Sequence, residues 1–163
     1  MAKKKDIKTN AMRILDQLDI KYTYLTYDCD QFEDGLKIAD LLNLPYELVY
    51  KTLVTEGSNK NYYVFVIPIS ENLDMKKAAR TVGEKSVVMI HVKDIDQVTG
   101  YIRGGCTAIG MKRPYRTIIS DTAKNLDKIH VSGGKIGIQI QLSPDDLCLA
   151  SGAAYGDVIV KKH

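Results

Sequence analysis

The sequence predicts a mixed α/β domain in which helices pack against a mixed β-sheet. Segments with helical spacing of apolar residues alternate along the chain with short strand-like segments. Residues 52–56 and 62–69 are joined by the loop GSNKN, which is typical of a β-hairpin and argues against a strictly parallel, doubly wound sheet. No internal repeat, low-complexity segment or long linker divides the 163 residues. We therefore expect one domain over residues 1–163.

The first quarter of the chain predicts two helices around a strand. Apolar residues at helical spacing follow Thr9, a preferred N-cap residue, and indicate a helix over residues 9–19. Residues 22–28, rich in aromatic and β-branched side chains, indicate a strand. A second helix is expected over residues 35–42, and Pro45 makes the chain restart in a short helical segment that ends at Val49.

The hairpin is followed by three shorter elements. Residues 73–82 indicate a helix that begins near Asp74 and ends at Gly83. Residues 86–90 indicate a short buried strand, and residues 92–98 a helix closed by Gly100.

The second half is rich in glycine. Residues 115–120 indicate a strand, and the alternating apolar residues of 136–142 indicate another with one buried face. Ser143 to Asp146 form a helix cap before a short last helix, and we expect residues 156–163 to be peripheral.

Composition excludes several classes of protein. The 45% apolar and 26% charged residues rule out a disordered or fibrous chain. The three cysteines form no C-x-x-C pair and the three histidines have no metal-binding spacing, so we expect no disulfide scaffold, no metal and no cofactor. A net charge of +3 permits an anionic partner but is too small for a DNA coat. No apolar run is long enough for a signal segment or a membrane span, which predicts a cytoplasmic protein without a membrane partner.

Lys51 is the first candidate for chemistry, because it interrupts the apolar stretch VYKTLV. Either its side chain extends to solvent from a half-buried strand, or a partly desolvated pocket holds its ammonium to stabilise a developing negative charge. Thr52 beside it is more often a strand former than a ligand contact. The position alone leaves both interpretations open.

Two glycine loops are the second candidate. Residues 103–110 and Ser132-Gly133-Gly134 present backbone N–H groups with little side-chain obstruction, as oxyanion holes and phosphate nests require. Either loop alone is more often a simple connection, but two of them favour a shared pocket that includes Gly104 and Gly105. Cys106 has no histidine at a specifying position, so we assign it no catalytic role.

Basic residues form two sets. Those of residues 76–85 are compatible with a solvated helix face, whereas the second set flanks the first glycine loop, where positive charge suits a phosphate: Arg103, Lys112, Arg113 and Arg116.

The order and spacing of VYKTLV, LDMKKAARTVG, TGYIRGGCTAIGMKR, TIISD and VSGGKIGIQIQLSPDDL resemble the YbaK/EbsC family of free-standing aminoacyl-tRNA deacylases. These are similar to the editing domain inserted in bacterial prolyl-tRNA synthetases. The resemblance implies a curved, barrel-like mixed sheet and a mischarged tRNA as substrate, typically Cys-tRNA(Pro), with prolyl-tRNA synthetase as a further partner. By the same resemblance, Lys51 with Thr52 corresponds to the family's pocket lysine, Tyr27 to the tyrosine that ends the first strand, Gly104 to the first loop glycine, and Ser132 to the serine before the double glycine.

Two residues depart from the family pattern, namely Ile136, where cysteine-specific members often have arginine, and Gln139, where some have aspartate. Gln139 keeps hydrogen bonding but loses charge, so selectivity for Ala-tRNA or Ser-tRNA stays open. The resemblance implies that the substrate's own thiol attacks its ester carbonyl while loop amides bind the oxyanion, which makes the reaction formally lyase-like rather than hydrolytic. The alternative class is a non-catalytic module that binds aminoacyl-tRNA or a synthetase.

Overall fold

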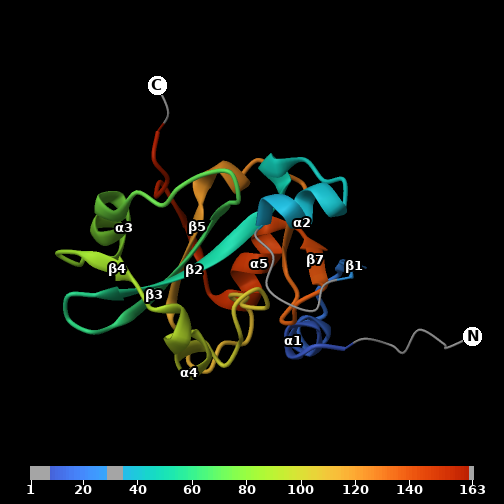
Figure 1. The fold of residues 1–163 in the computed structure, drawn as a ribbon, viewed down its shortest axis with the longest axis horizontal. Coiled ribbons are helices and arrows are strands. Elements are labelled where there is room, and N and C mark those ends of the chain that lie inside the picture. The colour runs from blue at the N-terminus through green and yellow to red at the C-terminus, as the bar shows by residue number, and fades with distance from the viewer. Residues whose placement is uncertain (1–7, 29–34, 162–163) are drawn as a thin grey trace, which may run out of the picture.

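The computed structural model describes residues 8–28 and 35–161, whose strands form two sheets (Figure 1). The three-stranded sheet is antiparallel, in the order β1 (Thr23–Thr26), β7 (Ile138–Leu142) and β6 (Ile129–Ser132). The five-stranded sheet has the order β4 (Val87–Met89), β2 (Tyr50–Gly57), β3 (Tyr62–Pro68), β5 (Arg116–Ser120) and β8 (Ala154–Gly156). Its first three strands pair antiparallel, whereas β3, β5 and β8 pair parallel.

These pairings confirm the prediction of a mixed sheet with packed helices. The hairpin is also confirmed, because β2 and β3 pair in register with Leu53 opposite Phe65. The barrel-like closure is not confirmed, since the described strands form two open sheets, with an isolated parallel bridge between Val49 and His130.

The helices begin and end where local chemistry predicts. Thr9 caps α1 (Asn10–Gln17) by accepting a hydrogen bond from the Met12 amide, and Asp74 and Ser143 cap α3 (Met75–Val82) and α5 (Pro144–Ser151) in the same way. Gly83 ends α3 and Gly100 ends α4 (Ile95–Thr99) in the left-handed conformation. The other bounds are α2 (Gly35–Leu41), η1 (Tyr46–Leu48), η2 (Val92–Asp94) and η3 (Asp121–Ala123).

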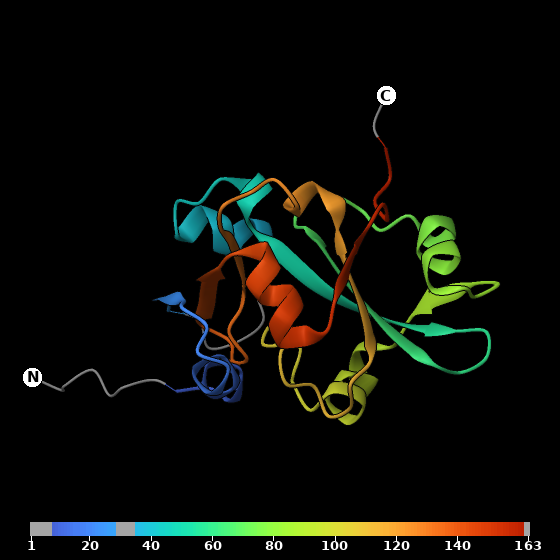
Figure 2. The same ribbon diagram turned by 180° about the vertical axis from the view of Figure 1, so that it is seen from behind.

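The two faces of β3 contribute to different cores, because successive strand side chains point to opposite faces. Val64 and Val66 join the main core, which includes residues of α1, α5 and both sheets, whereas Phe65 and Ile67 pack under α3. Figures 1 and 2 show α3 beside β4 at one end of the molecule and α1 and α2 toward the other end, near β7. None of the helices in the described ranges is long and apolar enough to cross a membrane.

Two predictions about burial are wrong. The strand at residues 86–90 was expected to be buried, but β4 is a sheet edge on which Val88 is 60% exposed. The C-terminal segment was expected to be peripheral, but β8 pairs with β5 and Val158 is fully buried. In β7 the expected alternation is present at Ile138 and Ile140, yet Gln139 on the opposite face is buried as well.

Candidate functional site

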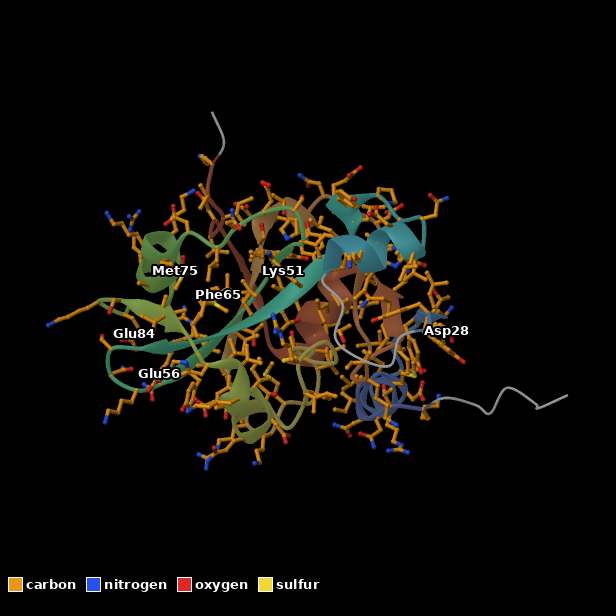
Figure 3. All side chains as sticks on the ribbon, in the orientation of Figure 1. Asp28, Lys51, Glu56, Phe65, Met75 and Glu84 are labelled. Carbon is orange, nitrogen blue, oxygen red and sulfur yellow. The ribbon has the colours of Figure 1, made fainter. Side chains whose placement is uncertain are left out.

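A cavity of about 640 Å³ extends along β2, and residues of α2, β4, η2, α4 and both glycine loops also line it. Figure 3 shows Lys51 on β2, near the middle of the molecule. The polar or small lining residues are Gly35, Tyr50, Lys51, Thr52, Ser70, Asn72, Arg103, Gly104, Cys106, Ser132 and Gln139. Apolar side chains form most of the remaining wall, and among the described lining residues there is no carboxylate and no histidine.

Lys51 brings a cation into this cavity. It is the second residue of β2 and lies opposite Ile67 of β3, and its Nζ donates a 3.4 Å hydrogen bond to the Ile69 carbonyl oxygen. Burial lowers the pKa of the Lys51 ammonium, and the nearby charge of Glu71 opposes this shift with a smaller effect. The geometry therefore corresponds to the partly desolvated pocket rather than to a side chain extended to solvent.

The two glycine loops lie side by side at the cavity wall. Ser132 Oγ donates a 3.3 Å hydrogen bond to the Gly104 carbonyl oxygen. A Cβ atom built on Gly105 would lie only 3.0 Å from the Lys135 Cα atom, so the two backbones approach too closely for a side chain at position 105. Gly104 itself has φ +87°, a conformation that favours glycine. Both loops line this one cavity, the first through Arg103, Gly104 and Cys106 and the second through Ser132.

Only some of the loop amides are available to a ligand. The Gly105 amide donates to the Ile102 carbonyl at 3.0 Å, and the Gly133 amide donates to the Ile138 carbonyl at 2.9 Å. By contrast, the amides of Gly104 and Cys106 donate no hydrogen bond to another residue of the described chain, and both residues line the cavity. At this loop the amides of Gly104 and Cys106, and not that of Gly105, are therefore the ones left available to a ligand.

Gln139 is a buried polar residue on the cavity wall. It is 5% exposed, and its Oε1 atom has no hydrogen-bond partner among the residues that the structure describes. A buried acceptor in this state costs about 1–3 kcal/mol. A hydrogen-bond donor of a bound ligand would offset this cost, which makes Gln139 a candidate contact for an ammonium or hydroxyl group.

Cys106 lines the cavity without being reactive. Burial raises the pKa of its thiol to about 11, so that the thiol stays protonated at neutral pH. This agrees with assigning Cys106 no nucleophilic role.

The remaining predicted site residues do not line the cavity. Tyr27 lies beside Gly137, three residues after the second loop: its amide donates a 2.9 Å hydrogen bond to the Gly137 carbonyl, and its hydroxyl oxygen is buried. Gly105 and Gly133 hold the loops in shape through the hydrogen bonds above. A Cβ on Gly134 would meet Tyr101 and Thr9, away from the cavity lining.

The predicted basic set beside the first glycine loop is dispersed in the fold. Arg103 does line the cavity. Lys112, however, donates to the Gln97 carbonyl of α4, and Arg116 donates to the Thr81 carbonyl of α3. Lys77, expected on a solvated face, pairs with Asp157 at 3.0 Å and secures the C-terminal segment.

Sequence reasoning missed most of the apolar wall. Ile38 lies on α2, Met89 on β4 and Val92 on η2, and Ile69 lies in the turn after β3. No spacing in the sequence relates them, because only the tertiary fold brings these elements around β2.

Comparisons with known proteins agree on one family. The model of the aminoacyl-tRNA editing domain matches residues 33–148. A curated protein of Enterococcus faecalis, the candidate Cys-tRNA(Pro)/Cys-tRNA(Cys) deacylase EbsC, is 40% identical over 99% of this chain and 100% of its own length.

Solved structures share the fold. A candidate trans-editing enzyme for prolyl tRNA synthetase has a TM-score of 0.78 at 20% identity, covering 96% of this chain and 100% of the other. A protein described only as hypothetical has a TM-score of 0.81 at 20% identity, covering 91% of this chain and 97% of the other.

Proposed function

The chain belongs to the aminoacyl-tRNA editing domain family, and on that premise we propose that it removes cysteine from mischarged Cys-tRNA(Pro) by cleaving the aminoacyl ester. One observation carries the proposal: a cavity that contains a partly desolvated lysine and unused loop amides, but no histidine, carboxylate or ionised thiol among its described lining residues. The described lining residues can bind and polarise an ester, but none of them supplies a nucleophile or a general base.

The reaction can proceed if the substrate supplies the nucleophile. The thiol of the cysteinyl group attacks its own ester carbonyl, an S–C bond forms, and the C–O bond to the ribose breaks. The thiol proton passes to the departing ribose oxygen, and the cysteinyl group leaves as a four-membered thiolactone. No group of the protein changes its covalent bonding: the reaction is an intramolecular acyl substitution, formally lyase-like because it forms a ring as the tRNA leaves, and the thiolactone is then hydrolysed in water.

The protein contributes binding and charge stabilisation. The Gly104 and Cys106 amides receive the oxyanion of the tetrahedral intermediate, and Ser132 fixes the Gly104 carbonyl so that the loop holds this geometry. Lys51 is the catalytic residue, because its ammonium orients the ester and stabilises the negative charge that develops on the carbonyl oxygen. Thr52 lies beside it on the cavity wall. Gln139 Oε1 accepts a hydrogen bond from the cysteinyl ammonium, which satisfies the buried acceptor.

Such an activity is needed because a synthetase cannot select accurately between two amino acids of similar size. A synthetase pocket shaped for proline rejects a similarly sized amino acid by only about 1–3 kcal/mol, so a second site that destroys the wrong product restores accuracy. In this proposal the protein acts in the cytoplasm as one editing domain, receives mischarged tRNA released by prolyl-tRNA synthetase, and needs no cofactor.

The test is a deacylation panel on tRNA(Pro) charged with cysteine, alanine or serine, at protein concentrations well below that of the tRNA. We expect multiple turnovers of Cys-tRNA(Pro), strong loss in Lys51→Ala, and wild-type rates in the matched control Lys76→Ala, because Lys76 is exposed on α3. Stoichiometric binding without turnover would instead support the non-catalytic module.

The panel also tests the mechanism. Seryl-tRNA(Pro) nearly keeps the size of the cysteinyl side chain but replaces the thiol with a hydroxyl, and S-methylcysteinyl-tRNA(Pro), larger by one methyl group, has no free thiol, so both should resist cleavage if the thiol is the nucleophile. Equal cleavage of the alanyl, seryl and S-methylcysteinyl substrates would retain the deacylase and reject thiol assistance.

A further inference from the structure

The cavity is larger than the amino acid that it is proposed to receive. A cysteinyl group has about six non-hydrogen atoms, whereas a volume of about 640 Å³ is that of roughly twenty water molecules. Most of the cavity is therefore available to another part of the ligand. This argument rests on the function proposed above and extends it to the nucleic-acid end of the substrate.

Three apolar side chains that line the cavity are also exposed to solvent. Leu36 of α2, Met89 of β4 and Val92 of η2 all line the cavity, yet they are 40%, 45% and 52% exposed. We call these three residues the apolar rim. Other apolar lining residues, such as Ile38 and Ile69, are 6% exposed. Exposed apolar surface that continues into a binding cavity is typical of a surface that a ligand covers.

The charge of the lining indicates the class of that ligand. Lys51 and Arg103 are cationic, and the described lining contains no carboxylate. A ligand that combines negative charge with a flat apolar surface fits both observations. The terminal nucleotide of a tRNA has this combination, because its phosphate is anionic and its base presents two apolar faces.

We infer that the apolar rim of Leu36, Met89 and Val92 holds the 3′-terminal base of the tRNA, while the ester lies further inside against Lys51 and the Gly104 loop. The rim side chains carry no hydrogen-bonding group, so they contact the face of the base without reading its edges. Binding at the rim therefore depends on the presence of a base more than on its identity. The thioether of Met89 adds favourable contact with an aromatic ring.

The test compares two small esters that differ only in the base. One is the cysteinyl ester of adenosine, and the other is the cysteinyl ester of methyl riboside, which has no base. We expect the wild type to prefer the adenosine ester in kcat/KM by roughly tenfold. This preference should fall several-fold in Met89→Ser and disappear in the triple variant Leu36→Ser/Met89→Ser/Val92→Ser.

Val88→Ser is the matched control. Val88 adjoins Met89 on β4 and is 60% exposed, but it does not line the cavity. Its variant should keep the full preference for the adenosine ester, and because all these side chains are exposed, circular dichroism should show that every variant folds. An unchanged preference in Met89→Ser, or a wild type that cleaves both esters equally, would overturn the inference.

A separate measurement distinguishes failure of the rim from failure of the proposed function. If the wild type cleaves neither ester nor Cys-tRNA(Pro), the proposed function is rejected. The rim is then judged by equilibrium binding of the trinucleotide CpCpA. Weaker binding by Met89→Ser than by Val88→Ser supports the rim, and equal or absent binding rejects it.

Discussion

The hydroxyl of Ser132 donates a 3.3 Å hydrogen bond to the carbonyl oxygen of Gly104 and thereby joins two loops that are 28 residues apart in the sequence. Both residues line the cavity. The bond fixes the orientation of the peptide group between Gly104 and Gly105, which lies between the two available amides of Gly104 and Cys106. The geometry proposed for oxyanion binding therefore depends on how closely the two loops pack.

Gly105→Ala should loosen this packing. The new methyl group would meet backbone atoms of Lys135 at 3.0–3.2 Å, so one loop must move by a few tenths of an ångström. We expect the free energy of unfolding to fall by about 1–3 kcal/mol, as in other overpacked sites, and deacylation to slow. Lys135→Ala is the control, because the conflict is with the Lys135 backbone and its side chain is exposed. Urea denaturation measures both variants, and a fully stable Gly105→Ala would contradict the close approach.

Deprotonation of Lys51 should make kcat/KM for deacylation fall at alkaline pH, below the ordinary lysine pKa of 10.5. We call this fall the alkaline limb of the pH profile. Burial lowers the pKa of its ammonium, so the cation is lost, and kcat/KM falls, at a lower pH than for an exposed lysine. Lys51→Arg keeps a charge throughout this range, and its profile should lack that limb even if its rate is reduced. Lys51→Ala should lose on the order of 10²-fold in kcat/KM.

The measurement is kcat/KM against pH, corrected for spontaneous ester hydrolysis. An identical alkaline limb in wild type and Lys51→Arg would assign the titration to another group, such as the substrate thiol.

Features of the fold that depend on neighbouring residues could be predicted from the sequence. The caps at Thr9 and Ser143, the end of α3 at Gly83 and the β2–β3 hairpin all follow from local chemistry. The exposure of β4 and the burial of Val158 could not be predicted, because each depends on which strand occupies the edge of the sheet. Strand order is set by contacts between segments distant in the sequence, which local patterns do not encode.

The same division applies to the site. Lys51, Gly104 and Ser132 were found because an isolated lysine and clustered glycines are visible in the sequence, and the fold brings all three to one cavity. The sequence did not show which loop amides remain available to a ligand, because only the fold makes the Gly105 and Gly133 amides donate to the carbonyls of Ile102 and Ile138. The apolar rim was missed for a related reason, because its residues belong to three separate elements.

Gln139→Leu should make the protein more stable and less active. In the free protein Gln139 Oε1 is buried without a hydrogen-bond partner among the described residues, so an apolar side chain of similar size removes a desolvation cost. We expect the free energy of unfolding to rise by up to about 1 kcal/mol. Deacylation should fall because the ligand loses its acceptor.

Gln141→Leu is the matched control on the same strand. Gln141 Oε1 accepts a 3.0 Å hydrogen bond from Thr23, and its Nε2 lies 3.3 Å from His130 Nε2. This substitution should therefore lower stability while leaving kcat/KM unchanged. Thermal unfolding and deacylation assays measure the two effects, and full activity in Gln139→Leu would remove Gln139 from the ligand site.

His130 should make the protein less stable in mild acid. It is 3% exposed, and burial lowers the pKa of its imidazole below the ordinary value of 6.5. Between these two pKa values the unfolded chain binds more protons than the folded one, so stability falls as pH drops below 6.5, by at most about 1.4 kcal/mol per pH unit. His130→Gln cannot titrate and should lose less stability between about pH 7.5 and pH 5.

Urea denaturation at both pH values checks this prediction for His130. His91→Gln, at an exposed position, is the control that should keep the wild-type dependence of stability on pH. The same loss of stability in His130→Gln as in the control would place the acid sensitivity on the carboxylates instead.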